Sequence, residues 1–357
     1  MVKKVTIRDI AREAGVSICC VSWVLGNHPR SKVVGEETRQ RILDAAASLG
    51  YVQNQLAIAT RTGQVNTIGV ILNFAFGQDT AFVNKIVEGI LVEASIRKHY
   101  IKIFSDDDLE ASFRAIRENR INSVISTSVL APVREKTAEL AEKSGIQLVF
   151  CYERGHGKVP AVNADNEENT ARAVHFLAEK GHTRIGLFCV PHWATYVDDR
   201  HNGYLRGMNE CGLTVDPRWI RCSDAIERSV KDMLSLPKQL RPTAYVALSD
   251  IVAAKAQREA WRRGLRIPEE FSIVGIGDSE AACAAMVPLT TFQENYFETG
   301  KILVQLALGE NPDIAPDGCN VYRTHSEMIE RESVCTIAAC SKSQVSSSKS
   351  QAASHKI

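Results

Sequence analysis

The sequence lacks the short motifs that identify the commonest enzyme classes. It contains no Gly-x-x-x-x-Gly-Lys-Ser/Thr phosphate loop, no His-Glu-x-x-His zinc motif and no Gly-x-Ser-x-Gly nucleophile turn. Gly275 and Gly277 form a lone Gly-x-Gly pair without the third glycine of a dinucleotide-binding turn. These absences argue against an enzyme, and we expect no catalytic residue and no cofactor.

The ten cysteines lack the spacing of a metal or redox centre. None belongs to a Cys-x-x-Cys pair, and the adjacent Cys19 and Cys20 would diverge by about 100° around a helix. We therefore expect no metal site. We expect the other cysteines to be small buried hydrophobic residues with reduced thiols.

Long apolar runs are missing as well. No stretch approaches the ~20 apolar residues that cross a membrane, and a charged segment follows Met1 where a signal peptide would be apolar. We therefore expect a cytoplasmic protein. The segment from Ser341 onward is rich in serine and free of acids, which predicts a disordered tail over residues 336–357.

Charge is distributed unevenly along the chain. The whole sequence has a net charge of +1, whereas residues 1–63 hold nine Lys or Arg against five acids, a difference of +4. A basic amino-terminal region on a near-neutral body is typical of a DNA-binding module joined to a second domain.

Two short amphipathic helices are predicted at the amino terminus. Thr6 can cap the first helix with Asp9 as a weak capping box, and Gly15 permits a tight turn after it. Ser17 can cap the second helix. The apolar residues follow helical spacing in both segments: Ile7, Ile10, Ala11 and Ala14, then Val21, Val24 and Leu25.

The second helix has the form of a recognition helix. Its outward positions carry small and varied side chains: Ile18, Cys19, Cys20, Ser22 and Trp23. A third helix over residues 36–49 would close a three-helix core. Such a unit can lay its second helix in the major groove of DNA. A helical hairpin that binds nothing would show the same periodicity.

From residue 65 onward, strand-like apolar runs alternate with amphipathic helices. This order predicts parallel sheets with helices on both faces, and about 270 residues suit two lobes. The predicted strands are Thr67–Leu72, Ile101–Phe104, Ser123–Ser126, Gln147–Phe150, Arg184–Cys189, Thr243–Leu248 and Phe271–Gly275. The predicted helices are Asn84–Lys98, Val133–Ser144, Asn166–Lys180, Tyr204–Cys211, Ile251–Arg263 and Glu298–Gly309.

Three motifs occur in a fixed order between about Val5 and Ser333. They are the segment Thr6–Leu25, the segment Glu36–Tyr51, and Arg61-Thr62-Gly63 followed by the strand from Thr67 to Ile71. In this order they resemble the lac-repressor (LacI/GalR) family of bacterial transcriptional regulators. The resemblance implies an all-α helix-turn-helix head and an α/β, two-lobed periplasmic-binding-protein-like domain of type I, with doubly wound parallel sheets.

The resemblance also sets the expected domain boundaries. The DNA-binding head covers residues 1–52, a hinge helix or linker covers 53–64, and the two-lobed domain for effector binding and dimerisation covers 65–335. In this family the chain crosses between the lobes three times. We place the crossings near Val159–Asn163, Pro288–Phe292 and Val321–Thr324.

Family members grip DNA through the head and the hinge. The resemblance assigns DNA contacts to Thr6, Ser17, Ile18, Cys19, Cys20, Ser22, Trp23, Asn27, Arg30, Asn54 and Leu56. The family often has Ala-Thr at Cys19-Cys20 and a polar or basic residue at Trp23. Trp offers one N–H and an apolar face but not the paired guanine contact of Arg, so we expect an uncommon operator. Arg30 suits a phosphate contact or a solvated loop equally well.

The hinge segment departs from the family in a further way. The leucine that wedges into the minor groove in relatives falls at Thr60 here, and the usual arginine falls at Ile58. Leu56 lies one turn earlier. Either Leu56 takes over the wedge, or it packs against a partner hinge and the protein bends DNA less.

Candidate effector-binding residues follow the carboxyl ends of predicted strands, where open α/β sheets bind ligands. They are Phe74, Phe82, Trp193, Arg200, Asp250 and Asp278. Arg200 lies in a segment that matches the one bearing an effector-clamping arginine in the family. Carboxylates and a guanidinium can hold sugar hydroxyls with paired hydrogen bonds. The alternatives are interlobe salt bridges for Arg200 and Asp278, and core packing for each aromatic residue.

The sequence therefore predicts a sequence-specific DNA-binding transcriptional regulator, with repression expected. A homodimer would bind a near-palindromic operator, and a small effector, expected to be a sugar or sugar derivative, would change operator affinity. A small-molecule binding protein without DNA function, or an α/β enzyme, is the alternative. The effector, the operator, induction against co-repression, and dimer against tetramer are left open by the residues.

Overall fold

The structure is a computed structural model, and it describes residues 5–26, 28–51, 65–72, 81–191 and 194–337. They fall into two compact units, Met1–Asn66 and Thr67–Ile357. Several predictions lie outside the described residues: the hinge helix, the disordered tail, and the contacts of Asn27, Asn54, Leu56, Phe74 and Trp193.

The amino-terminal unit, called the head below, is a bundle of three α-helices. Its elements are α1 (Ile7–Ala14), α2 (Ile18–Leu25), the 3₁₀ helix η1 (Pro29–Val33) and α3 (Glu36–Ser48). The Thr6 N–H and hydroxyl both donate to the Asp9 carboxylate, at 2.9 and 2.7 Å, and the Ser17 hydroxyl accepts the Cys20 N–H at 3.2 Å. Both predicted caps are therefore confirmed. Gly15 makes the turn in the left-handed region at φ +65°.

All three helices contribute to the core of the head. The buried residues are Ile10, Ala11, Ala14, Val21, Val24, Ile42, Ala45 and Ala46. The predicted three-helix core is confirmed. One predicted outward residue was placed wrongly, because the Cys20 side chain packs partly against this core.

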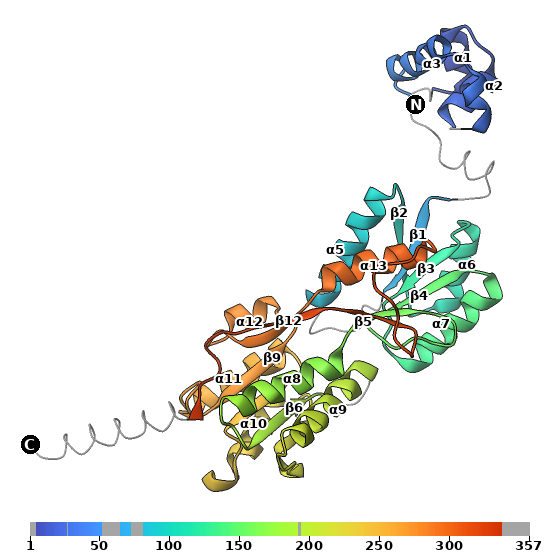
Figure 1. Ribbon diagram of the computed structural model, residues 1–357. Helices are drawn as coiled ribbons and strands as arrows, with labels where there is room; N and C mark the ends of the chain where they lie inside the picture. Colours follow the sequence, from blue (N-terminus) through green and yellow to red (C-terminus); the bar gives the residue numbers. More distant parts are fainter. Residues whose placement is uncertain (1–4, 27, 52–64, 73–80, 192–193, 338–357) are drawn as a thin grey trace, which may run out of the picture. The chain divides into compact units, whose positions relative to one another are not determined.

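The first lobe of the second unit is a six-stranded sheet in the order β11-β5-β4-β3-β1-β2, with all neighbours parallel. Its strands are β1 (Thr67–Leu72), β2 (Tyr100–Ser105), β3 (Ser123–Ser126), β4 (Gln147–Cys151), β5 (Ala161–Ala164) and β11 (Val321–Thr324). Helices α5 (Ala81–Ile96) and α13 (Tyr296–Ala307) pack together on one face (Figure 1). Helices α6 (Leu109–Glu118) and α7 (Ala131–Ser144) lie side by side on this lobe.

The second lobe repeats this architecture with the order β12-β10-β9-β8-β6-β7. Its neighbours are parallel except for the antiparallel pair β10 and β12. The strands are β6 (Ile185–Cys189), β7 (Ile220–Cys222), β8 (Ala244–Ala247), β9 (Ser272–Ile276), β10 (Thr290–Glu294) and β12 (Ser326–Ile329). The helices are α8 (Asn166–Glu179), α9 (Thr195–Glu210), α10 (Ile226–Leu234), α11 (Asp250–Arg262) and α12 (Glu280–Ala284), with η2 (Pro217–Trp219) and η3 (Lys238–Leu240) between them.

The chain crosses between the lobes at Asp165, Asn295 and His325. Each crossing is later than predicted, because the segments placed there are themselves short strands: β5, β10 and β11. Four- and five-residue strands carry too few alternating positions to be separated from an extended connection by pattern alone.

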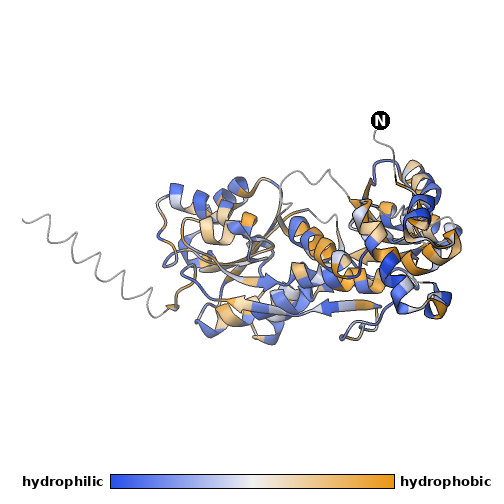
Figure 2. Ribbon diagram, turned by 90° about the horizontal axis from the view of Figure 1, so that it is seen from above, coloured by the Kyte–Doolittle hydropathy of each residue, from blue (hydrophilic) through white to orange (hydrophobic). Residues whose placement is uncertain are grey.

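Each lobe has its own apolar core, built from the strands and the inward faces of their helices. Hydrophobic and hydrophilic residues accordingly share the same helices in Figure 2. Within the described part of the chain, no helix combines the length and apolar character that crossing a bilayer requires.

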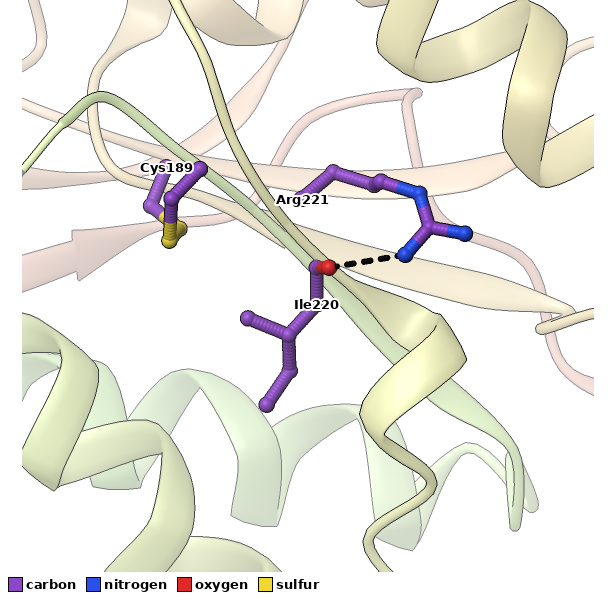
Figure 3. The surroundings of a disulfide bond; sticks show 4 residues. Cys189, Ile220 and Arg221 are labelled. Atoms are coloured by element: carbon purple, nitrogen blue, oxygen red, sulfur yellow. Dashed lines mark hydrogen bonds between the residues drawn. A yellow bond between two sulfur atoms is a disulfide. The ribbon is translucent and has the colours of Figure 1, made fainter.

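The expectation that the cysteines of the body are reduced and buried is wrong for Cys189, Cys222 and Cys335, which are disulfide-bonded. Cys189 and Cys222 form a disulfide between β6 and β7, with their Cα atoms 4.3 Å apart (Figure 3). Cys222, Cys283 and Cys319 are also exposed rather than buried. The sequence did not indicate the pairing because 33 residues separate the two cysteines, and only sheet formation brings them together.

Candidate functional site

The head exposes most of the predicted DNA-contacting side chains. Thr6, Ser17, Cys19 and Arg30 are exposed, and Ile18 is 43% exposed although it is a large apolar residue. Ser22 and Trp23 are half-buried.

Trp23 belongs to a small stacked group on the head. The His28 ring lies nearly parallel to the indole with centroids 6.3 Å apart, and the Arg30 guanidinium lies 5.8 Å from the indole centroid. The 3₁₀ helix η1 begins with Pro29, and its cap His28 accepts the Arg30 N–H at 3.1 Å. The turn after α2 therefore holds a cation against the last turn of that helix.

A buried polar cluster forms where the two lobes meet. We call Tyr152, Arg200, Glu294 and Tyr296 the interlobe cluster. Arg200 comes from α9 and Glu294 from β10 in the second lobe, whereas Tyr152 follows β4 and Tyr296 begins α13 in the first lobe. All three nitrogens of the Arg200 guanidinium are engaged. Nη2 donates to both Glu294 oxygens at 2.9 Å and to the Tyr152 hydroxyl at 2.5 Å.

The other two nitrogens of Arg200 hold the second lobe together. Nε donates to Asn166 Oδ1 at 2.7 Å, and Nη1 donates to the Leu248 carbonyl. The Tyr296 hydroxyl donates to Glu294 at 2.6 Å, and the Tyr152 hydroxyl donates to the same carboxylate. The Glu294 carboxylate thus accepts hydrogen bonds from residues of both lobes.

Burial and charge shift the pKa values of the cluster. Burial is the largest single influence on the pKa of Arg200 and would lower it, but the Glu294 carboxylate and the surrounding tyrosines together outweigh burial and raise that pKa. Burial raises the pKa of Tyr152 and of Tyr296 well above the ordinary range, and Glu294 adds to both shifts. The tyrosines therefore remain neutral hydroxyl donors and the arginine remains a cation across the physiological range.

Two further aromatic rings, Phe82 and Tyr196, pack against the tyrosines and the arginine of the cluster. Phe82 lies 5.2 Å from Tyr152 and 5.7 Å from Tyr296, measured between ring centroids, and Tyr152 lies 5.3 Å from Tyr196. Arg200 also stands 5.3 Å from the Tyr196 ring centroid. Flat apolar faces beside hydroxyl, carboxylate and guanidinium groups are suited to a ligand that carries both C–H faces and hydroxyls.

The two residues after Tyr152 also bind the second lobe. Glu153 accepts the Thr195 N–H at 3.2 Å and the Thr195 hydroxyl, and Arg154 pairs with Asp199, both on α9. Arg134 pairs with Glu153 at 2.8 Å from the first lobe. Burial raises the pKa of Glu153 to about 7, although Arg134 and the hydrogen bonds oppose the shift. The loop after β4 is therefore a titratable connection between the lobes.

A close helix contact places Arg200. Gly203 lies on α9 where that helix meets α8, and a Cβ atom at Gly203 would sit 2.2 Å from the Glu167 carbonyl oxygen. The absence of a side chain lets the two backbones approach. Arg200, one turn earlier, can then reach Asn166 at the start of α8.

Asp250 and Asp278 take part in a different network. Asp250 is buried and accepts from Thr291 at 2.5 Å and from the Ser279 N–H at 2.7 Å. Asp278 pairs with Arg331 at 2.6 Å. A Cβ atom at Gly275 would lie 2.4 Å from the Asp250 carboxylate, which explains the Gly-x-Gly pair without any nucleotide. Of the predicted effector residues, the structure brings Phe82 and Arg200 together through Tyr152.

Tyr152, Glu294 and Tyr296 were missed by sequence reasoning. Each stands at a lobe crossing or directly after a short strand, so periodicity gave no signal for them. Asn166 was predicted as the start of a helix and as part of a run, residues 163–166, that resembles the lobe-crossing motif of the lac-repressor family. Glu294 lies two residues beyond the predicted crossing Pro288–Phe292, so a search within that crossing would also have missed it. No group of three or more His, Cys, Asp or Glu in the described ranges could hold a metal ion.

A pocket of about 490 Å³ lies beside the crossings, between α8 and α13. Its walls include Asn169 from α8, Glu298 from α13 and Ser326 from the start of β12. Asn169 donates to Ser326 at 3.0 Å and to Glu294 at 3.4 Å, which ties the pocket to the interlobe cluster. Because its walls come from different lobes, the width of this pocket depends on the angle between them.

Large apolar side chains are exposed on the edge of the first lobe. α5 contributes Leu91, Val92 and Ile96, and β2 contributes Tyr100 and Ile103. Exposed apolar residues grouped on neighbouring elements mark a surface for protein–protein contact. We call this group the α5–β2 surface.

Two parts of the chain match known families. Residues 6–54 match the family described as bacterial regulatory proteins of the lacI family, and residues 174–334 match the periplasmic binding protein-like domain. The first match covers α1 to α3 of the head, and the second covers most of the second lobe and the later crossings.

Individual relatives span nearly the whole chain. The HTH-type transcriptional regulator RegA of Clostridium saccharobutylicum is 29% identical over 342 residues, which cover 92% of this chain and 98% of that protein. The HTH-type transcriptional repressor CytR of Escherichia coli K12 is 29% identical over 316 residues, covering 85% of this chain and 89% of that protein.

Solved structures share the fold. The lac repressor dimer bound to operator and the anti-inducer ONPF superimposes with a TM-score of 0.74 at 23% identity, covering 93% of this chain and 100% of that one. The transcriptional regulator CelR in complex with cellobiose gives a TM-score of 0.64 at 23% identity, covering 92% of this chain and 100% of that one. The predicted combination of a helix-turn-helix head and a two-lobed body is confirmed.

Proposed function

The chain belongs to the lacI family of bacterial regulatory proteins, and from this we propose a transcriptional repressor in which ligand binding between the lobes controls operator affinity. The single observation that carries the proposal is one chain with a lacI-type head that is followed in the sequence by two lobes sharing a polar interlobe cluster. Such a repressor works on chromosomal DNA, so we place it in the cytoplasm.

We assign DNA contact to the exposed side of α2 and the turn that follows it. Ser17, Ile18 and Cys19 present small or apolar groups, and Trp23 with Arg30 presents an indole edge beside a cation. The indole suits apolar contact with a thymine methyl group, and Arg30 suits a phosphate. One head of this size contacts too few base pairs for useful specificity, so two heads on a near-palindromic site are required.

We assign dimerisation to the α5–β2 surface. The lac repressor, which has the same fold, is described as a dimer on its operator. A second copy would remove the exposed side chains of Leu91, Ile96 and Ile103 from water. The triple variant Leu91→Ser, Ile96→Ser and Ile103→Thr should sediment as a monomer and bind the operator much more weakly.

We place the effector against the interlobe cluster. Arg200, Glu294 and two tyrosine hydroxyls can exchange their mutual hydrogen bonds for bonds to ligand hydroxyls, and Phe82 with Tyr196 can cover an apolar ring face. A sugar or sugar derivative carries both features. The similar CelR binds cellobiose in its solved complex, which supports this class.

The mechanism is linkage between two sites through the lobe angle. A ligand that exchanges bonds with the cluster changes the relative free energies of open and closed lobes. It can change operator affinity only by the ratio of its affinities for those two states. The contacts of Glu153 and Arg154 with α9 stabilise the lobe arrangement of this structure.

Operator binding is tested first by selecting bound duplexes from a random pool, followed by affinity measurements at several salt concentrations. The expected result is a symmetric sequence bound far more tightly than competitor, with affinity falling as salt rises. Equal affinity for all duplexes, with or without every ligand tried, would overturn the DNA-binding proposal.

Effector binding is tested by thermal unfolding against separate panels of sugars, sugar phosphates and nucleosides. A true ligand at one hundred times its Kd stabilises the native state by ~2.7 kcal/mol. Tyr296→Phe keeps the ring but removes one hydroxyl from Glu294, so it should weaken that response. Stabilisation by nucleosides alone would replace the sugar assignment.

A further inference from the structure

A disulfide stands at the ligand-facing end of the second lobe. Cys189 is the last residue of β6 and Cys222 is the last residue of β7, and the two are direct partners in the parallel register (Figure 3). In parallel α/β sheets this carboxyl end is the one that lines the ligand crevice. The Ser223 N–H also donates to the Cys189 carbonyl at 2.9 Å.

The two sulfur-bearing residues differ sharply in exposure. Cys189 is fully buried in the core of the lobe, whereas Cys222 is exposed. β7 has three residues and lies at the edge of the sheet beside β6. A dissolved thiol or peroxide can therefore reach the Cys222 side of the bond, while Cys189 is shielded.

The segment after Cys189 leads into the interlobe contacts. Helix α9 begins six residues later at Thr195, which binds Glu153 of the first lobe. Farther along the same helix, Asp199 pairs with Arg154 and Arg200 donates to Tyr152, both in the first lobe. The end of β6 thus precedes, by six residues, the part of α9 that touches the first lobe. Tying that end to β7 restricts how far the start of α9 can move.

We propose that Cys189 and Cys222 form a reversible thiol–disulfide site that controls the mobility of the amino-terminal turns of α9. The disulfide holds α9 against the first lobe, and reduction loosens it. A cytoplasmic location makes the reduced pair the resting form and the disulfide the response to oxidants. The site adds a second input to the proposed interlobe cluster, and its chemistry does not depend on the identity of DNA or effector.

The oxidation has two balanced steps with hydrogen peroxide as oxidant. The Cys222 thiolate attacks one peroxide oxygen, so an S–O bond forms, the O–O bond breaks and one water leaves after taking up a proton. The Cys189 thiol then attacks the Cys222 sulfur, which forms the S–S bond and releases the second water. The two sulfurs lose two electrons to the peroxide. Two glutathione molecules reverse the change through a mixed disulfide at Cys222 and leave as oxidised glutathione.

The first test measures the bond itself in the full-length protein. Wild type is treated with hydrogen peroxide or with reduced glutathione, alkylated, digested and examined by mass spectrometry. We expect the peptide pair carrying Cys189 and Cys222 to appear with peroxide and to disappear with glutathione. A bond that glutathione cannot reduce, or that peroxide cannot form from the reduced protein, would overturn the proposal.

The second test measures the coupling by hydrogen exchange in residues 195–200, without DNA or effector. We expect exchange in the oxidised protein to be slower than in the reduced protein by a factor on the order of ten. Cys222→Ser changes an exposed position and should abolish the difference, whereas Cys283→Ser, an exposed cysteine on α12, should keep it. Equal exchange in both redox states, or an unchanged response in C222S, would overturn the coupling. Since neither test uses DNA or a sugar, their outcomes are independent of the proposed function.

Discussion

The head and the interlobe cluster carry function in opposite ways. In the head, the candidate contacts Ser17, Ile18 and Cys19 are exposed and the core beneath them is small. In the body, Arg200 and Glu294 are buried and bound on every side. The head presents exposed side chains to a partner. In the body, the polar groups hydrogen-bond one another, and a ligand must replace those hydrogen bonds with its own. Substitutions in the head should therefore change recognition, and substitutions in the cluster should first change stability.

Removal of the Glu294 charge should have the largest effect. Glu294→Leu leaves the Arg200 cation buried without its carboxylate, which costs about 3–5 kcal/mol in the free energy of unfolding. Urea unfolding of the full chain measures it. Glu330→Gln is the matched control, because the exposed pair of Glu330 with Lys180 contributes roughly 0–1 kcal/mol. A loss of under 1 kcal/mol in E294L would mean that the cluster is not held by this ion pair.

Substitution of Gly203 by alanine should cause the next largest loss in the free energy of unfolding. Gly203→Ala forces a methyl group against the Glu167 carbonyl oxygen and separates α9 from α8. The free energy of unfolding should fall by about 1–3 kcal/mol. The same urea titration measures this loss. Gly318→Ala is the control, since a Cβ atom there meets nothing within 4 Å. If both variants unfold at the same urea concentration, close helix approach does not position Arg200.

A change in the head should alter recognition with little loss of stability. Trp23→Ala removes the indole that Arg30 and His28 pack against, and we expect altered preference at one or two operator positions by about 1–3 kcal/mol. Selection of bound duplexes from a random pool with the variant measures this. Recovery of the wild-type preference would remove Trp23 from the base contacts.

The smallest predicted effect is a pH dependence from Glu153. Its pKa is raised to about 7, so between its ordinary pKa and pH 7 the native state binds more protons than the unfolded state. Stability from this group is therefore complete at low pH and is lost as pH rises through 7. Wild type should gain about 1 kcal/mol between pH 8 and pH 6 relative to Glu153→Gln, measured by urea unfolding at both values. Parallel pH profiles for the two proteins would refute the assignment.

The fold was predictable where local patterns are long. Apolar spacing and cap residues, which lie within a few positions of each other along the chain, predict the three helices of the head and both caps. The same kind of local pattern predicts seven strands of the body. The short strands β7 and β12 and the helices α6, α10 and α12 were not predicted. Residues 195–203 of α9 were also left out of the predicted helix, because Asp198, Asp199 and Asn202 gave that segment the composition of a loop.

The sequence by itself determined that a helix-turn-helix head precedes a two-lobed body, and it determined part of the exposed side of the head, because these depend on neighbours along the chain. Tertiary structure alone decided that Arg200 meets Tyr152 and Glu294, which are 48 and 94 residues away, and that Cys189 meets Cys222. Those contacts arise when three short crossings bring two separately folded sheets together. No local spacing encodes them, because the residues share neither a helix nor a strand until both lobes have formed.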